Sequence, residues 1–105
     1  IVDGKIVGAK IRNLKTEEEK ELRFDGLFVS IGRKPVTELF GNAFALDEAG
    51  YIVADETTKT NIPGVYAVGD VRTKVLRQVI TAASDGAVAA HFAEEYLSFK
   101  SFENM

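Results

Sequence analysis

The sequence has 105 residues, enough for one domain with a single core and too few for two complete domains. Apolar residues make up 46% of the chain, which argues against general disorder. Thirteen basic and sixteen acidic residues give a net charge of −3, with no dense basic block to suit a nucleic-acid partner. The sequence contains no cysteine and one histidine, His91, which excludes disulfide chemistry and argues against a histidine metal cluster within these residues.

No apolar run approaches the ~18 residues that cross a bilayer, and the first residues lack the pattern of a signal peptide. We therefore expect a soluble chain with no membrane partner. The sequence begins Ile1-Val2-Asp3 instead of with methionine, which suggests a processed product or a piece of a longer protein.

The first third has the pattern of antiparallel β-structure. Asp3-Gly4 suits a tight turn. Apolar residues then alternate with others over residues 6–14, which predicts a strand with one buried face. The alternation resumes at Leu22 and Phe24, so the charged stretch 15–21 is interpreted as the exposed tip of a hairpin.

A continuous apolar run, residues 27–31, favours a strand buried on both faces. It ends at Gly32, and Pro35 disfavours regular structure in the residue before it. We place a domain boundary there, between residues 34 and 35.

The remaining residues predict short strands and one long helix. Short strands are expected at 50–53 and 65–68. Gly86, inside the expected helix 78–98, predicts close packing against a sheet, since glycine there otherwise costs about 1 kcal/mol. The helix is about 30 Å long, and its apolar stripe has spacings of 4, 4, 3, 3 and 4: Val79, Ala83, Ala87, Ala90, Ala93 and Leu97.

The candidate site lies between the strand at 65–68 and this helix. Ligands of open α/β sheets gather beyond the carboxyl ends of strands, where the carboxylate of Asp70 can accept hydrogen bonds from a sugar-like hydroxyl. The alternative is a turn aspartate that caps its own backbone. The helix start at Gln78 and Val79 offers unpaired N–H groups to an anion or a polarised carbonyl, although a solvated helix end has the same sequence.

Arg77 has two interpretations, either a solvent-exposed charge or a contact to a phosphate or cofactor. No G-x-G-x-x-G motif, P-loop, or nucleophile with a plausible base is present, so we predict no catalytic residue and no metal ligand in this chain.

Several segments closely resemble the C-terminal third of low-molecular-weight bacterial thioredoxin reductases, and the resemblance covers almost the whole chain. The segment Gly69-Asp70-Val71 at this distance from Arg77-Gln78 is specific, whereas an isolated Gly-Asp is not. The matching segments are Phe28-Val29-Ser30-Ile31-Gly32 with Pro35, Gly50-Tyr51-Ile52-Val53, the run from Thr60 to Val71, and Arg77-Gln78-Val79-Ile80-Thr81-Ala82-Ala83.

The resemblance implies a partial FAD/NAD(P)-binding α/β fold: an N-terminal antiparallel hairpin plus a strand, then short strands and one long C-terminal helix. Residues 1–34 would close an NADPH-binding domain, and residues 35–105 would end an FAD-binding domain. Asp70 would bind the ribityl chain of FAD, and the backbone at Gln78 and Val79 would approach the flavin C2 carbonyl. The implied cofactor-binding residues are Gly69, Asp70, Val71, Arg77, Gln78, Val79 and Ile80.

The implied function is that of a fragment of a cytoplasmic, NADPH-dependent FAD flavoprotein that reduces thioredoxin. The family's phosphate-binding loop, Cys-x-x-Cys pair and NADPH loop do not occur in these residues, so we expect the isolated chain to be inactive. Sheet edges without neighbours predict a homo-oligomer. Two alternatives stay open: a related flavoprotein, either a peroxiredoxin reductase or a ferredoxin–NADP reductase, and a non-catalytic domain that self-associates.

Overall fold

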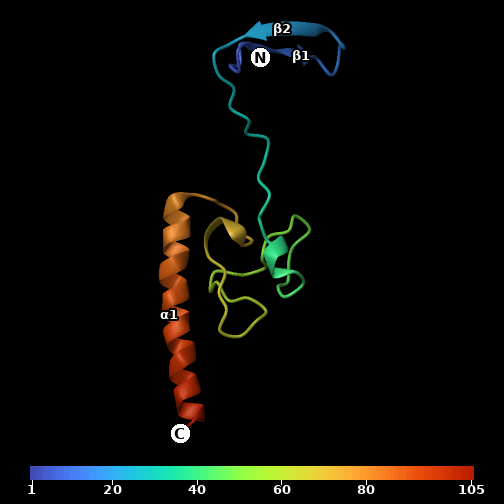
Figure 1. Ribbon diagram of the computed structural model, residues 1–105. Coiled ribbons are helices and arrows are strands. Elements are labelled where there is room, and N and C mark those ends of the chain that lie inside the picture. Colours follow the sequence, from blue (N-terminus) through green and yellow to red (C-terminus); the bar gives the residue numbers. More distant parts are fainter. The chain divides into compact units, whose positions relative to one another are not determined.

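The computed structural model describes all 105 residues and divides them into two compact units, Ile1–Gly32 and Arg33–Met105. The first unit contains strands β1 (Gly8–Arg12) and β2 (Glu19–Arg23). The second contains two short 3₁₀ helices, η1 (Glu38–Phe40) and η2 (Gly69–Val71), and one long helix, α1 (Val79–Glu103) (Figure 1).

The predicted hairpin is confirmed. β1 pairs with β2 in antiparallel register, from Gly8 opposite Arg23 to Arg12 opposite Glu19. The tip is shorter than predicted, because β2 already begins at Glu19, within the stretch expected to be the tip. The charged residues of β2 are compatible with a strand because the two-stranded ribbon is exposed to solvent. Lys10 of β1 forms an ion pair with Glu19 of β2 there.

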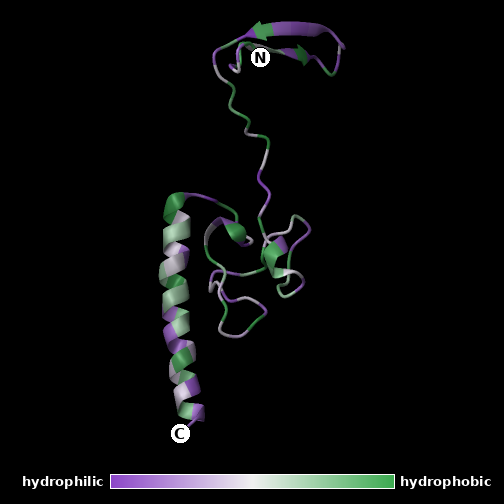
Figure 2. Ribbon diagram, viewed as in Figure 1, coloured by the Kyte–Doolittle hydropathy of each residue, from purple (hydrophilic) through white to green (hydrophobic).

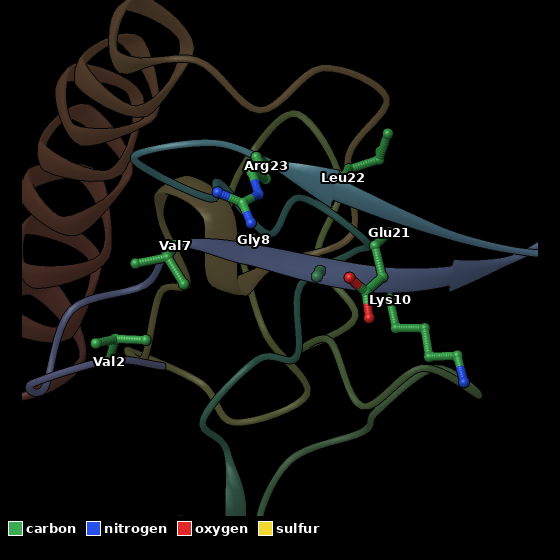
Figure 3. A pocket seen from close by; sticks show the side chains of 8 residues that line it. Val2, Val7, Gly8, Lys10, Glu21, Leu22 and Arg23 are labelled. Carbon is green, nitrogen blue, oxygen red and sulfur yellow. The ribbon is translucent and has the colours of Figure 1, made fainter.

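The apolar face of the hairpin is only partly buried, contrary to prediction. Ala9 lies opposite Leu22, but Leu22 is 37% exposed and Val7 is 47% exposed. These side chains border a hollow of about 440 Å³, together with Val2 and the polar residues of both strands (Figure 3). The alternating pattern correctly predicted the two strands. Two strands cannot enclose a core by themselves, and this unit supplies no further layer to cover their apolar face.

The prediction of a buried strand at 27–31 is wrong for this structure. These residues form no strand and make no backbone hydrogen bonds, and the side chains of Phe28 and Ile31 are 97% and 93% exposed. The physical reason is that a strand buried on both faces needs neighbouring strands and covering layers. No strand of this chain pairs with it.

The predicted short strands of the second unit are isolated bridges instead of continuous strands. Ile52 pairs with Leu46 on one side and with Arg72 on the other, and Lys59 pairs with Tyr66. Because each of these segments has few neighbouring strands to pair with, each bridge comprises a single residue pair. The bridges nevertheless hold together a small core of Ile52, Ala54 and Ala67, against which Phe44 and Val71 pack.

The predicted long helix is confirmed, and it continues five residues beyond the expected end at 98, to Glu103. Hydrophobic residues recur along its whole length (Figure 2). However, the predicted stripe faces solvent: Val79 is 87% exposed and Leu97 is 63% exposed. Of the stripe, only Ala93 is half-buried, and the other buried or half-buried residues of α1 lie on another face of the helix: Thr81, Ala82, Asp85, Val88, Ala89, Phe92 and Tyr96.

The expected close packing at Gly86 is also not found, since a Cβ placed there meets nothing within 4 Å. Gly86 lies on the exposed side of α1, where no sheet is present in this chain. No helix in the structure is both long enough and apolar enough to cross a membrane.

Candidate functional site

The acidic candidate, Asp70, lies in the tight turn η2, which follows the buried residue Ala67. The turn starts at Gly69, whose φ of +74° is unfavourable for any residue with a side chain. A Cβ at Gly69 would also lie 3.4 Å from the Cβ of Ala82 in α1. The glycine therefore lets the turn lie directly against the helix.

The Asp70 side chain does not cap its own backbone, so that alternative is wrong. Its Oδ2 instead accepts a hydrogen bond from Arg33 Nη1 at 2.8 Å, and Oδ1 accepts none. The Asp70 side chain is 46% exposed and that of Arg33 is 69% exposed. An ion pair this exposed is weak, so the carboxylate remains available to a ligand.

The start of α1 presents fewer free amides than the sequence suggests. Gln78, in extended conformation, precedes the helix, and its N–H donates to Thr81 Oγ1 at 3.1 Å. The first hydrogen bond of the helix backbone runs from the Ala82 N–H to the Gln78 carbonyl. The amides of Val79 and Ile80 have no partner, and they carry the partial positive charge of the helix end.

Arg77 is not the solvent-exposed charge of the first interpretation, and its contact to a phosphate or cofactor stays a prediction. Its side chain is half-buried, with the guanidinium 3.8 Å from the centre of the Tyr51 ring. Its Nε donates to the Asp70 carbonyl and its Nη2 to the Arg72 carbonyl, both at 3.2 Å. Arg77 therefore braces the loop between η2 and α1 through backbone carbonyls, which sequence spacing does not reveal.

The structure brings four of the seven candidate residues to one hollow. Asp70, Arg77, Gln78 and Val79 line a cleft of about 260 Å³, together with Arg33 and Ala82. The other three, Gly69, Val71 and Ile80, do not line the cleft. Gly69 and Val71 instead form the turn that carries Asp70, and Ile80 is 75% exposed.

A buried ionic cluster beside this cleft was not predicted. Asp85 Oδ2 accepts hydrogen bonds from the Gly69 N–H, from Arg72 Nε and from Lys74 Nζ, and Oδ1 accepts one from Arg72 Nη2, all at 2.8 Å. The exposures of Arg72 and Asp85 are 2% and 6%. One sequence signal was present: Asp85 is a charge on the helix face that also contains Ala82 and Ala89, where an unpaired carboxylate would be costly.

These contacts hold the carboxylate in its charged form. The hydrogen bonds from Arg72, aided by those from Lys74 and the Gly69 N–H, keep the pKa of the Asp85 carboxyl far below its usual range in spite of its burial. The same hydrogen bonds raise the pKa of Arg72. The cluster is therefore a permanent ion pair at neutral pH and carries no proton-transfer role.

Comparison with known proteins places the chain in a family. A sequence model of the pyridine nucleotide-disulphide oxidoreductases matches residues 2–86. A 34.2 kDa protein in the rubredoxin operon of Clostridium pasteurianum is 51% identical over 90 residues, which is 86% of this chain and 29% of that protein. The thioredoxin reductase of Peptoclostridium acidaminophilum is 46% identical over 101 residues, covering 90% of this chain and 32% of that protein.

The crystal structure of Lactococcus lactis thioredoxin reductase superposes with a TM-score of 0.80 at 45% identity, covering 91% of this chain and 32% of that one. The predicted partial FAD/NAD(P)-binding α/β fold is thereby confirmed. The chain belongs to the pyridine nucleotide-disulphide oxidoreductase family. Within it, the chain is similar to thioredoxin reductases and spans about a third of the length of the relatives cited here.

Proposed function

We propose that this chain forms the C-terminal part of the FAD site in an NADPH-dependent flavoprotein that reduces thioredoxin. The observation that carries the proposal is the shared cleft, whose lining includes both Asp70 and residues of the first turn of α1. Relatives named thioredoxin reductase match about 90% of the chain, which supports the choice of acceptor.

The residues of the cleft fit the polar end of a flavin and its sugar-alcohol chain. Asp70 Oδ1 is an unpaired acceptor suited to a ribityl hydroxyl, and the Val79 N–H is an unpaired donor suited to a ring carbonyl. Gly69 leaves no side chain between the turn and the helix. Arg77 keeps the intervening loop in place through the Asp70 and Arg72 carbonyls.

When bound, FAD would supply the two-electron chemistry that links NADPH to a disulfide. The work of this chain is binding and electrostatics. The amides at the start of α1 place partial positive charge along the cleft, which favours negative charge on a ring carbonyl held there. Asp70 would orient the ribityl chain of FAD, which leads to the flavin ring.

The two units have different proposed roles. Residues 1–34 would complete the NADPH-binding domain, and residues 35–105 would complete the FAD-binding domain. We expect the isolated chain to be inactive and free of flavin, because its cleft offers only one part of a cofactor site. The exposed run 27–31 favours self-association of the isolated chain, and a cytoplasmic location follows from the proposed activity.

The test is a chimera in which residues 1–105 replace the matching segment of the Peptoclostridium acidaminophilum thioredoxin reductase. We expect the purified chimera to retain stoichiometric FAD and to reduce thioredoxin with NADPH. Asp70→Ala should weaken FAD binding, whereas Asp25→Ala, an exposed aspartate with no hydrogen-bond partner, should not. FAD content and the dissociation constant of FAD are measured by absorbance and by flavin fluorescence.

Val79→Pro tests separately what the Val79 N–H contributes to FAD binding. Val79 is the first helical residue, where proline is tolerated, and the extended Gln78 (φ −140°, ψ 159°) suits a residue before proline. The helix should therefore persist while one N–H is lost, which should lower the affinity for FAD or the flavin potential. A chimera that folds and binds no FAD, or one that is indifferent to Asp70→Ala and Val79→Pro, would refute the proposal. For the isolated chain, size-exclusion chromatography with an absorbance scan separates a colourless oligomer from a yellow flavoprotein.

A further inference from the structure

Asp85 accepts a hydrogen bond from the turn η2, which carries Asp70. Asp85 also belongs to α1, the helix whose first turn lines the same cleft. It lies in the second turn of α1, six residues after Val79, where the helix begins. From there its Oδ2 accepts the N–H of Gly69, the residue immediately before Asp70. A single carboxylate therefore connects the two structural elements that line the cleft.

The other end of the acidic turn is held by the same carboxylate. Arg72 directly follows η2, and it contacts Asp85 through Nε and Nη2, each at 2.8 Å. Arg72 Nη1 also donates to the Thr73 carbonyl at 2.8 Å, which fixes the chain as it leaves the turn. Asp70 is therefore flanked on both sides by backbone that Asp85 anchors.

Besides Asp85, Arg77 restrains the turn, since its Nε donates to the Asp70 carbonyl at 3.2 Å, and the remaining restraints on Asp70 are weaker. Its ion pair with Arg33 is exposed to solvent, and η2 has only three residues. A 3₁₀ turn of this length has little intrinsic stability. Glycine at position 69 also has no side chain to restrict its backbone if its N–H loses the acceptor. The buried cluster, in which Asp85 accepts four hydrogen bonds of 2.8 Å, is thus the most extensive buried set of contacts on the turn that carries the Asp70 carboxylate.

We propose that Asp85 is a positioning residue for the flavin tail, holding Asp70 at a set place relative to the start of α1 through the Gly69 N–H and Arg72. This inference rests on the proposed function. Asp85 itself lies outside the cleft lining. Its contribution to FAD affinity must therefore pass through Asp70.

A double-mutant cycle in the chimera tests this dependence. Asp85→Asn is measured alone and in the Asp70→Ala background, with the dissociation constant of FAD as the readout. In the presence of Asp70 we expect Asp85→Asn to weaken FAD binding about tenfold, the loss typical of a charge-assisted hydrogen bond. In the Asp70→Ala background we expect less than about a twofold effect, because the residue that Asp85 positions is gone.

Two controls separate positioning from general stability. Glu94→Gln makes the same acid-to-amide change at an exposed position of α1 and should leave FAD affinity unchanged. Tyr66→Phe removes the hydrogen bond from the Tyr66 hydroxyl to the Phe92 carbonyl, away from the cleft, and should lower the melting temperature without changing FAD affinity. If Asp85→Asn does not fold, Asp85→Glu enters the same cycle, since it keeps the charge but displaces the carboxylate by one methylene.

The outcomes are distinct. An equal loss of FAD affinity with and without Asp70 would overturn the positioning role and leave Asp85 a purely structural residue, as would no loss in the presence of Asp70. If neither Asp70→Ala nor Val79→Pro changes FAD binding, the proposed function fails, and the positioning role fails with it. If only Asp70→Ala has no effect, the positioning role alone is overturned. If Asp85→Asn weakens FAD binding only when Asp70 is present, and neither control variant changes FAD affinity, the inference is supported.

Discussion

Replacing Arg72 by methionine tests how much of the second unit depends on its buried ion pair. The Arg72 side chain is 2% exposed, and methionine fills similar space but donates no hydrogen bond. Asp85 would retain only Lys74 and the Gly69 N–H as partners. Removing one partner of a buried pair costs about 3–5 kcal/mol. Because Lys74 still lies 2.8 Å from the carboxylate, we expect the lower end, about 3 kcal/mol.

The assay is urea unfolding of the full chain, followed by tyrosine fluorescence. The chain has no tryptophan, and all three tyrosines, Tyr51, Tyr66 and Tyr96, lie in the second unit, so the signal reports on that unit alone. The matched control is Arg33→Met in the same unit, where the arginine side chain is 69% exposed and its ion pair with Asp70 should contribute no more than about 1 kcal/mol.

A conservative variant sharpens the result. Arg72→Lys keeps the charge but loses the two-pronged contact to Asp85, so its free energy of unfolding should fall between those of the wild type and Arg72→Met. A loss below about 1 kcal/mol for Arg72→Met, the range of an exposed ion pair, would refute the view that this cluster organises the unit.

Three further predictions concern stability and use the same unfolding assay. Gly69→Ala should cost at least about 1 kcal/mol, because of its positive φ and the nearby Ala82 Cβ, whereas Gly86→Ala, in open space within α1, should gain about 0.5–1 kcal/mol. Thr58 is 0% exposed with an unpartnered hydroxyl, so Thr58→Val should stabilise by about 1 kcal/mol and Thr58→Ser should not; a loss for valine would contradict this. The lowered pKa of Asp85 means that its stabilisation is complete above the unfolded value of about 3.9 and is lost as pH falls toward the folded value. Wild-type stability should therefore decline below about pH 4, and the decline should be smaller in Asp85→Asn.

The features that sequence predicted well are those that depend on local chemistry. The helix was predicted because its apolar period needs no partner to be visible, and the hairpin because alternation and turn residues occur within a few positions. Asp70 and Val79 line one cleft in the structure, and the sequence could suggest this since the two positions are close along the chain. In each case the signal spans fewer than about 25 residues.

The features that sequence missed depend on which side chains meet in space. The Asp85 contacts to Gly69 and Arg72 join positions 16 and 13 residues apart, and Arg33 reaches Asp70 across 37 residues. Nothing in the spacing of these charges indicates which will pair. The bracing contacts of Arg77 were missed for a related reason, because its partners are backbone carbonyls, which have no signature in the sequence.

The wrong burial predictions have one physical cause. The run 27–31, the face of the hairpin that contains Ala9 and Leu22, and the outer stripe of α1 all have the pattern of buried surfaces, yet each remains partly or fully exposed. Patterning records burial in the complete fold, whereas exposure depends on the layers present in these 105 residues. Under the proposed function, the missing layers are the remaining sheet strands of the two dinucleotide-binding domains. The chimera provides that environment, so hydrogen exchange at residues 27–31 should slow there relative to the isolated chain, and equal exchange in both would contradict this explanation.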